Sequence, residues 1–263
     1  MPLAARMCHW PPILALLAIL AVLLALAFLG IALQRAFMPH RHLAGYHDNA
    51  GVLYQMIAMV YAVLLASMAV GVWDNYKQAK QVAEQEAAAM LGVARIVRFH
   101  PHAQGPKVQR LRKAILAYGE LVRDQEFAAM GRMERSPATV DAFQAVWADA
   151  CDLDPASLQD SNIQQEILAI LADAQKFRVA RLLAATRGLP ATLWFVISAC
   201  SVISMTGSAI FSSESFWPQF WMTLALATIT ALVIFAVVTL NYPFIGNVSV
   251  TPDGWQFVIR HLQ

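Results

Sequence analysis

Four stretches of the chain are apolar over a length that fits a lipid bilayer. A helix rises about 1.5 Å per residue, so roughly 20 apolar residues cross roughly 30 Å of hydrocarbon. None of the four contains Asp, Glu, Lys or Arg, and a proline or a glycine precedes each one. The pattern therefore predicts four transmembrane helices, over Ile13–Leu33, Val52–Val72, Ala191–Phe211 and Phe220–Leu240.

The segment between the second and third apolar stretches has the pattern of helices in water. The second stretch runs on without a break to about Arg98 through Ala, Gln and Glu, which are strong helix formers. A further helix is predicted from Pro106 to about Ala129. Two more are predicted to start at Pro137 and Pro155, because each proline follows a residue that commonly caps helices.

The last of these helices should pack one face on a neighbour and end at Arg187 and Gly188. Its apolar residues recur at spacings of three and four: Leu158, Ile163, Ile167, Ile170, Leu171, Ala174 and Phe177. After the fourth span, alternation over Asn247–Thr251 predicts a short extended segment. Pro252, Asp253 and Gly254 then predict a turn before a final amphipathic stretch.

The fold class that follows is an all-α integral membrane protein, with four transmembrane helices and a helical cytoplasmic insert between spans 2 and 3. We divide the chain into an N-terminal span with an extracytoplasmic loop (1–51), the second span (52–72), the helical cytoplasmic domain (73–189), spans three and four (190–240) and a C-terminal cytoplasmic tail (241–263).

Positive charge near the span ends predicts the orientation. Lys77 and Lys80 follow span two, and Lys176, Arg178, Arg181 and Arg187 precede span three. Cytoplasmic flanks carry such an excess of Lys and Arg, so the insert and both termini are expected in the cytoplasm. The first span is expected to stay as an anchor, because its apolar core exceeds the length of a signal peptide and Arg35 follows it.

Composition supports a membrane protein and excludes several functions. Hydrophobic residues make up 59% of the chain and charged residues 14%, against about 45–50% and about 25% in soluble domains. A net charge of +2 offers no basic surface for nucleic acid. The three cysteines show no metal-binding spacing, no motif indicates a cofactor, and no catalytic motif indicates an enzyme.

Two runs of residues resemble the bacterial bestrophin-like membrane family. The first, His47–Glu86, contains HDNAG, YAVLLA and VWDNYKQA, and the second, LNYPFIGNVSVTP at Leu240–Pro252, holds Pro243, Phe244, Gly246 and Pro252 of the family's closing motif. The chain departs from the family at Asn241, where members more often have Asp, and at Ser67, where they more often have Phe. The resemblance implies a bacterial inner-membrane protein. Similarity to true bestrophins, which are oligomeric anion channels, implies a homo-oligomer that conducts a small ion.

Polar residues inside the spans are candidates for a conduction path. Ser198, Ser201 and Ser208 lie largely on one face of span three, and hydroxyls there can replace part of an ion's hydration shell. Gln55 and Tyr61 in span two pose the same question. Small and hydroxyl-bearing residues also let helices pack closely, so both interpretations stay open.

Two further clusters have both a functional and an ordinary interpretation. Trp73, Asp74 and Tyr76 stand where span two leaves the membrane, either as a channel mouth or as interface anchors. His40, His42 and His47 crowd the first loop, where they are weak metal-ligand candidates, a pH-sensitive cluster or a solvated loop without a role.

Three hypotheses for the function follow. The first is a bestrophin-like homo-oligomeric channel in the lipid bilayer that passes a small ion, possibly an anion, along spans two and three. The second is a membrane-anchored regulatory protein whose cytoplasmic helices bind a partner. The third is an extracytoplasmic metal or pH sensor built on the histidine loop.

Overall fold

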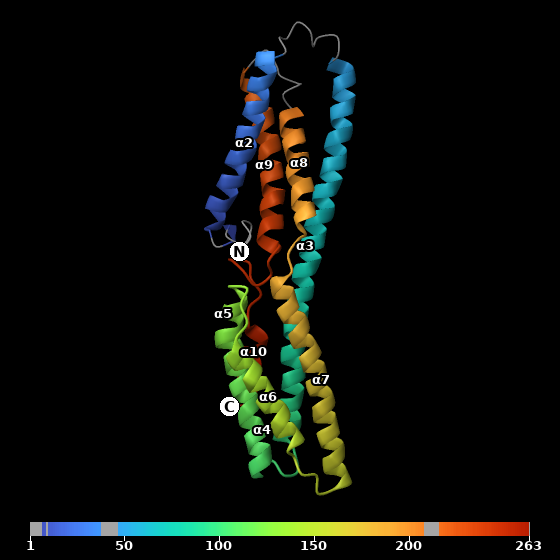
Figure 1. The fold of residues 1–263 in the computed structure, drawn as a ribbon, viewed down its shortest axis with the longest axis vertical. Helices are drawn as coiled ribbons and strands as arrows, with labels where there is room; N and C mark the ends of the chain where they lie inside the picture. The colour runs from blue at the N-terminus through green and yellow to red at the C-terminus, as the bar shows by residue number, and fades with distance from the viewer. Residues whose placement is uncertain (1–6, 9, 38–46, 208–215, 263) are drawn as a thin grey trace. The chain divides into compact units, whose positions relative to one another are not determined.

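The computed structural model describes residues 7, 8, 10–37, 47–207 and 216–262, which form two compact units that we treat separately. Unit one contains the described residues up to Asp74 together with Gly188–Asn241. Unit two contains Asn75–Arg187 together with the described residues from Tyr242 onward. Every regular element in these ranges is a helix, as the sequence predicted (Figure 1).

Unit one is built from apolar helices of membrane-spanning length. Its helices are α2 (Pro12–Phe37), the first part of α3 (His47–Arg98), α8 (Ala191–Gly207) and α9 (Phe216–Leu240). A window long and apolar enough to cross a membrane occurs in each of the helical stretches Pro12–Leu33, Gly51–Arg98, Leu158–Gly207 and Trp217–Leu240, the second and third of which extend into unit two. The prediction of an all-α membrane protein with four spans is therefore confirmed. The end of predicted span three, up to Phe211, lies outside the described residues.

Small side chains let the helices of unit one approach closely. Helix α2 packs against both α8 and α9, and Ala27, Ala227 and Ala231 at these contacts are fully buried. At Gly30 a Cβ atom would lie 2.8 Å from the Cα atom of Thr206. Because apolar side chains gain little by leaving lipid for another helix, such close backbone packing is what holds membrane helices together.

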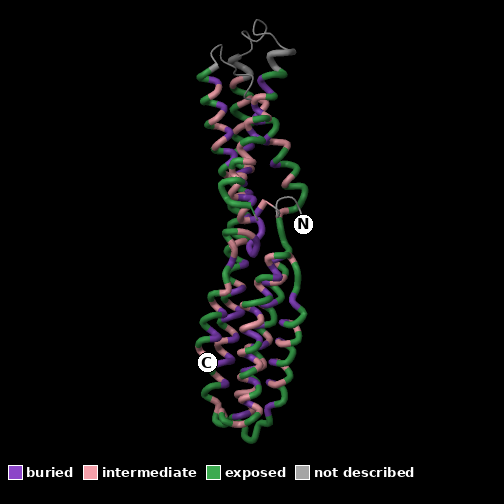
Figure 2. Tube along the Cα trace, turned by 90° about the vertical axis from the view of Figure 1, so that its left-hand side faces the viewer, coloured by how far each residue is buried: buried purple, intermediate pink, exposed green. Residues whose placement is uncertain are grey.

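Unit two is a helical bundle with an apolar core. It contains the second part of α3 with α4 (Pro106–Leu121), a π-helical turn (Val122–Glu126), α5 (Phe127–Met130), α6 (Pro137–Cys151), α7 (Leu158–Thr186) and α10 (Asp253–Leu262). Figure 2 shows the buried positions of this bundle in purple. The core includes Met90, Leu111, Tyr118, Leu171 and Trp255, each at most 1% exposed.

Helix α3 confirms the predicted unbroken continuation of span two to Arg98. Its buried positions recur at spacings of three and four, which places them on one face of the helix. In unit one they include Tyr61, Leu65, Met68 and Val72, and in unit two Ala79, Ala83, Glu86, Met90, Val93 and Val97. One of these buried positions, Glu86, is charged.

The start of α7 and the tail differ from the prediction. Helix α7 begins at Leu158 rather than at Pro155, because the Ser157 hydroxyl accepts the backbone N–H of Asp160 and caps the helix. Leu158, predicted in the packed stripe, is 81% exposed. The predicted extended segment before Pro252 contains no strand in the described structure, and Asp253 and Gly254 form the first turn of α10 instead of a separate turn.

The final amphipathic stretch is confirmed as α10, whose Trp255, Val258, Ile259 and Leu262 are buried in the core of unit two. The sequence had assigned the tail no packing partner. Its apolar face completes the bundle that α3, α4, α6 and α7 begin, since a helix with one apolar side has to bury that side.

Candidate functional site

Two polar residues of the predicted pore pair with each other. In unit one the Tyr61 hydroxyl lies 2.7 Å from the Ser201 hydroxyl, and both residues are buried. Ser201 also donates to the carbonyl of Ile197 at 2.7 Å. Two turns earlier on α3, the Tyr54 hydroxyl donates to the carbonyl of Ser204 at 3.0 Å. These bonds join α3 to α8, and such an arrangement is typical of helix packing in membranes.

The other pore candidates lie elsewhere. Gln55 and Ser198 are exposed in the single chain, and the Ser198 hydroxyl donates to its own helix at the Trp194 carbonyl. Ser208 lies outside the described residues. The three serines predicted to share one face of span three are thus divided between a buried and an exposed position, with the third not described. That any of them lines a path stays a prediction.

The exposed side of α3 in unit one is apolar. Val52, Met56, Met59, Val63 and Val70 are each more than half exposed, and helical spacing places them opposite Tyr61, the α3 residue that bonds to Ser201. In a bilayer this surface has to meet lipid, another protein surface or a pore.

The predicted mouth residues belong to different environments. Trp73 and Asp74 are exposed on α3 in unit one. Tyr76 is half-buried in unit two, where it packs against a small cluster that includes Ala79, Met130 and Phe244. A mouth formed by all three residues stays a prediction, while the side chain of Tyr76 is engaged in packing.

The histidine loop gives no further information about a metal site. His40 and His42 lie outside the described residues, and His47 is described only as the first residue of α3. Within the described ranges, no group of three or more His, Cys, Asp or Glu side chains is arranged to hold a metal ion.

A buried network of charges lies in unit two, and sequence reasoning missed it. The fully buried guanidinium of Arg181 donates to Glu86 at 2.6 Å and to Glu126 at 2.5 Å. Glu126 also accepts from Arg178 at 2.8 Å and from the Thr139 hydroxyl at 2.8 Å. The Tyr118 hydroxyl donates to Glu86 at 2.6 Å. Two arginines and two glutamates thus neutralise each other inside the bundle.

The electrostatics of this network favour the charged forms of Glu126 and Arg181. Burial opposes ionisation of Glu126, but Arg181 and Arg178 outweigh it and lower the pKa of the Glu126 carboxyl. Burial likewise favours the neutral form of Arg181, yet Glu86 and Glu126 raise the pKa of its guanidinium. Burial and the nearby Glu86 raise the pKa of Tyr118, which therefore stays a hydrogen-bond donor.

Local helix geometry supplies the residues of this network. Glu126 ends a π-helical turn, a rare deformation that is frequent at functional positions. Arg178 and Arg181 continue the buried stripe of α7 after Ile167, Leu171 and Ala174. The sequence pattern alone presents these arginines as charges that flank span three. Their place in an apolar stripe at helical spacing was the signal for burial.

The family's tail motif has a packing role in unit two. Gly246 has φ of 87°, a conformation that glycine adopts without strain. The loop around it is closed by a hydrogen bond from the Val250 N–H to the Pro243 carbonyl at 2.8 Å. The buried Phe244 ring meets Phe127 edge to face at 5.9 Å, and the Pro252 carbonyl accepts the first N–H groups of α10.

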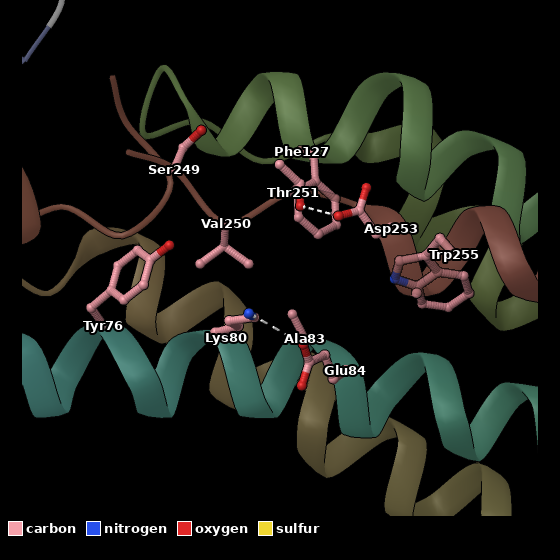
Figure 3. Close-up of a pocket in the computed structure, with 11 residues that line it drawn as sticks. Tyr76, Lys80, Ala83, Glu84, Phe127, Ser249, Val250, Thr251, Asp253 and Trp255 are labelled. Atoms are coloured by element: carbon pink, nitrogen blue, oxygen red, sulfur yellow. Dashed lines mark hydrogen bonds and ion pairs between the residues drawn. The ribbon is translucent and has the colours of Figure 1, made fainter. Parts of the chain in front are cut away.

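A small polar cavity lies beside this tail in unit two (Figure 3). Its volume is about 130 Å³. Inside, the Thr251 hydroxyl donates to Asp253 at 2.6 Å, and the Lys80 ammonium lies 3.9 Å from Glu84. The lining residues are Tyr76, Lys80, Ala83, Glu84, Phe127, Ser249, Val250, Thr251, Asp253, Gly254 and Trp255.

Comparison with known proteins gives a family and a fold. Residues 21–255 match the sequence model of the bestrophin-like domain, whereas no curated protein matches the chain. A zinc-phased crystal structure of a bacterial bestrophin homologue from Klebsiella pneumoniae has a TM-score of 0.63 at 11% identity, covering 94% of this chain and 96% of that one.

Two further crystal structures are similar. A single-residue variant of the Klebsiella pneumoniae homologue has a TM-score of 0.64 at 11% identity and covers 97% of both chains. A third structure, described as a membrane protein, has a TM-score of 0.65 at 10% identity and covers 94% of this chain and 97% of that one. Identities this low show a shared fold alone. Because the domain match extends over most of its length, this chain belongs to the bestrophin-like family.

Proposed function

We propose that the chain assembles into a homo-oligomeric ion channel of the bacterial inner membrane, with the helical insert and both termini in the cytoplasm. Membership of the bestrophin-like family supports the proposal, as do solved relatives that are bacterial bestrophin homologues. The four apolar helices provide the membrane part.

The exposed face of α3 in unit one is the observation that carries the proposal. Its opposite face is occupied by Tyr61, which bonds to Ser201, while Val52, Met59 and Val63 remain open in a single chain. When copies assemble around an axis, this face lines the path. A path along apolar side chains controls conduction by wetting and dewetting, since a narrow dry segment excludes hydrated ions.

Ion flux through the purified protein in liposomes tests the function, with anions and cations measured separately and the mass of the particle determined in detergent. Flux from a discrete oligomer supports the channel. A discrete, well-folded protein that passes neither anions nor cations contradicts it.

Two matched variants test the path. Val63→Ser places a hydroxyl on the exposed face of α3, and Ile229→Ser places one on α9 at a similar exposure, 62% against 65%. Because a serine in a helix can bond to the preceding turn, both should fold. We expect Val63→Ser to change flux severalfold through easier wetting and Ile229→Ser to leave it unchanged. If the two variants changed the ion flux equally, the path would not run along this face of α3.

A second candidate function, binding of a cytoplasmic partner, is favoured by a groove in unit two. The groove has a volume of about 400 Å³. Replacing Val179 by Lys should abolish partner binding while leaving flux intact. Its lining is mainly apolar and consists of Val140, Phe143, Gln144, Trp147, Gln175, Arg178, Val179 and Leu182.

A further inference from the structure

We propose that the small cavity in unit two binds a zwitterion that carries one carboxylate and one ammonium group, of the size of a small amino acid. The cavity lies between α3 and the segment that leads into α10 (Figure 3). Its binding role is independent of conduction, because all of its lining residues belong to unit two.

A buried donor without an acceptor points to a ligand. Trp255 is 1% exposed, and its indole N–H finds no hydrogen-bond partner among the residues that the structure describes. In Figure 3 the indole nitrogen lies on the side of the ring that faces the other lining residues. Buried N–H groups normally have an acceptor, because a buried donor without a hydrogen bond costs free energy. An indole donates and never accepts, so the missing group is an acceptor.

The orientation of this indole is fixed by its surroundings. The Trp255 ring packs edge to face on Tyr118 at 5.3 Å, and its backbone N–H donates to the Pro252 carbonyl at 3.0 Å. Tyr118 is itself held by its hydrogen bond to Glu86. A donor held in this way is prepared for its ligand, because little side-chain freedom remains to be lost on binding.

The charges around the cavity require both signs in the ligand. Lys80 lines the same cavity and adds a cation there, which suits a carboxylate. Glu84 and Asp253 add carboxylates, which suit an ammonium group. Asp253 accepts one hydrogen bond from Thr251, and a carboxylate has acceptor sites for more. A simple anion would satisfy the indole and Lys80 but would meet two like charges.

The volume limits the size of the ligand. A cavity of about 130 Å³ exceeds several-fold the roughly 30 Å³ that one water occupies in the liquid. It is smaller than the roughly 300–1,000 Å³ of pockets for drug-sized molecules. Nucleotides and peptides are therefore excluded, and a ligand of a few non-hydrogen atoms fits.

Contact with the indole nitrogen requires neighbouring side chains to move. The indole nitrogen has almost no accessible surface, so the ligand has to displace side chains to reach it. Lys80 and Glu84 suit this movement, because their side chains are 57% and 61% exposed and their 3.9 Å separation is a loose ion pair. Binding exchanges this weak pair for contacts of each partner with the ligand.

Titration calorimetry on the full-length purified protein tests the proposal, with alanine as the probe. Acetate and ethylammonium serve as the two halves of the ligand. We expect saturable binding of alanine, at least tenfold tighter than that of either half. Trp255→Phe keeps the ring but removes the N–H, and should weaken alanine binding about tenfold to a hundredfold because a hydrogen bond to a charged group is lost.

Control variants separate a specific site from a folding defect. Trp147→Phe also removes an indole N–H that is buried without a partner among the described residues, but Trp147 lies outside this cavity, so alanine affinity should stay unchanged. Lys80→Met is on the exposed rim and should weaken binding without altering stability. The proposal is overturned if alanine does not bind, if acetate binds as tightly as alanine, or if Trp255→Phe and Trp147→Phe have the same effect.

Discussion

Single side chains with charge determine how unit two is organised. Arg181 is fully buried and bonds to Glu86 and Glu126, which come from α3 and from the π-helical turn. Buried ion pairs contribute little net stability compared with apolar packing, because both charges lose their hydration. Breaking such a pair is costly, since it leaves a buried charge without compensation. We infer that the network acts mainly on which helix faces meet and adds little free energy.

Replacing Arg181 with Met should strongly destabilise the protein. The variant leaves Glu86 and Glu126 without their shared cation and should lower the free energy of unfolding by about 3–5 kcal/mol. Thermal unfolding in one detergent measures the loss. Arg132→Met is the matched control, because the Arg132–Glu134 pair is exposed and should contribute at most about 1 kcal/mol. Equal melting temperatures for the two variants would contradict a structural role for the buried network.

Acid should weaken unit two through Glu126. The arginines overcome the opposing effect of burial and hold its pKa below the ordinary value of 4.5. A group with a lowered pKa in the folded state stabilises the fold above its unfolded pKa, and this contribution is lost as the pH falls through the folded value. Stability should therefore decline below pH 4.5. The Glu126→Gln variant should be less stable at neutral pH, and its stability should fall less below pH 4.5. If the stability of the variant and of the original protein fell in parallel with pH, another group would be responsible.

At the scale of helices, packing in unit one depends on close approach. Helix α2 meets α8 where Gly30 faces Thr206, and a Cβ atom there would lie 2.8 Å from a backbone atom. Helix α3 contains another glycine, Gly71. A Cβ atom added to Gly71 would have no neighbouring atom within 4 Å. The two glycines look alike in the sequence, yet one is a contact and the other is open.

Alanine at these two positions should have opposite effects. Gly30→Ala forces α2 away from α8 and should cost about 1–3 kcal/mol, the usual range for overpacking. Gly71→Ala should be neutral or stabilising by up to about 1 kcal/mol, because alanine favours the helix. Melting temperatures of the two variants in the same detergent decide the matter. A stable Gly30→Ala protein would show that α2 and α8 are not in tight contact.

For the whole molecule, charged residues near the span ends bear on the orientation in the membrane. The proposal of a cytoplasmic insert rests on Lys and Arg near the span ends. Arg178 and Arg181 are among these charges and are buried in ion pairs, whereas Lys77, Lys80, Lys176 and Arg187 are exposed. The exposed lysines and Arg187 are sufficient for the rule, because it counts positive charge near the ends of spans.

Cys151 provides a natural probe of this orientation. It is exposed at the end of α6, while Cys8 is buried and Cys200 lies within α8. A membrane-impermeant maleimide should label Cys151 in inverted inner-membrane vesicles and fail to label it in intact spheroplasts. The Cys151→Ser variant identifies the labelled site. Labelling of Cys151 in spheroplasts would place the insert outside the cell and reverse the proposed topology.

The sequence by itself determined the membrane class, the number of spans, the unbroken α3 and the helix starts at Pro106, Pro137 and Ala191. These features depend on local quantities, namely apolar length, helical spacing and capping residues, which any short window of the chain contains. The family followed from two runs, His47–Glu86 and Leu240–Pro252, each of which is continuous along the chain. Where the local signals competed, as at Pro155 and Ser157, the hydrogen bond to Asp160 decided the helix start.

Only the tertiary structure decided which polar groups meet. Arg181 and Glu86 are 95 positions apart, and Tyr61 and Ser201 are 140 apart. Each pairing depends on which helix faces pack together, and helical spacing fixes a face without naming its neighbour. The cavity beside Trp255 arises in the same way, because the tail has to fold back onto α3 before its polar groups converge.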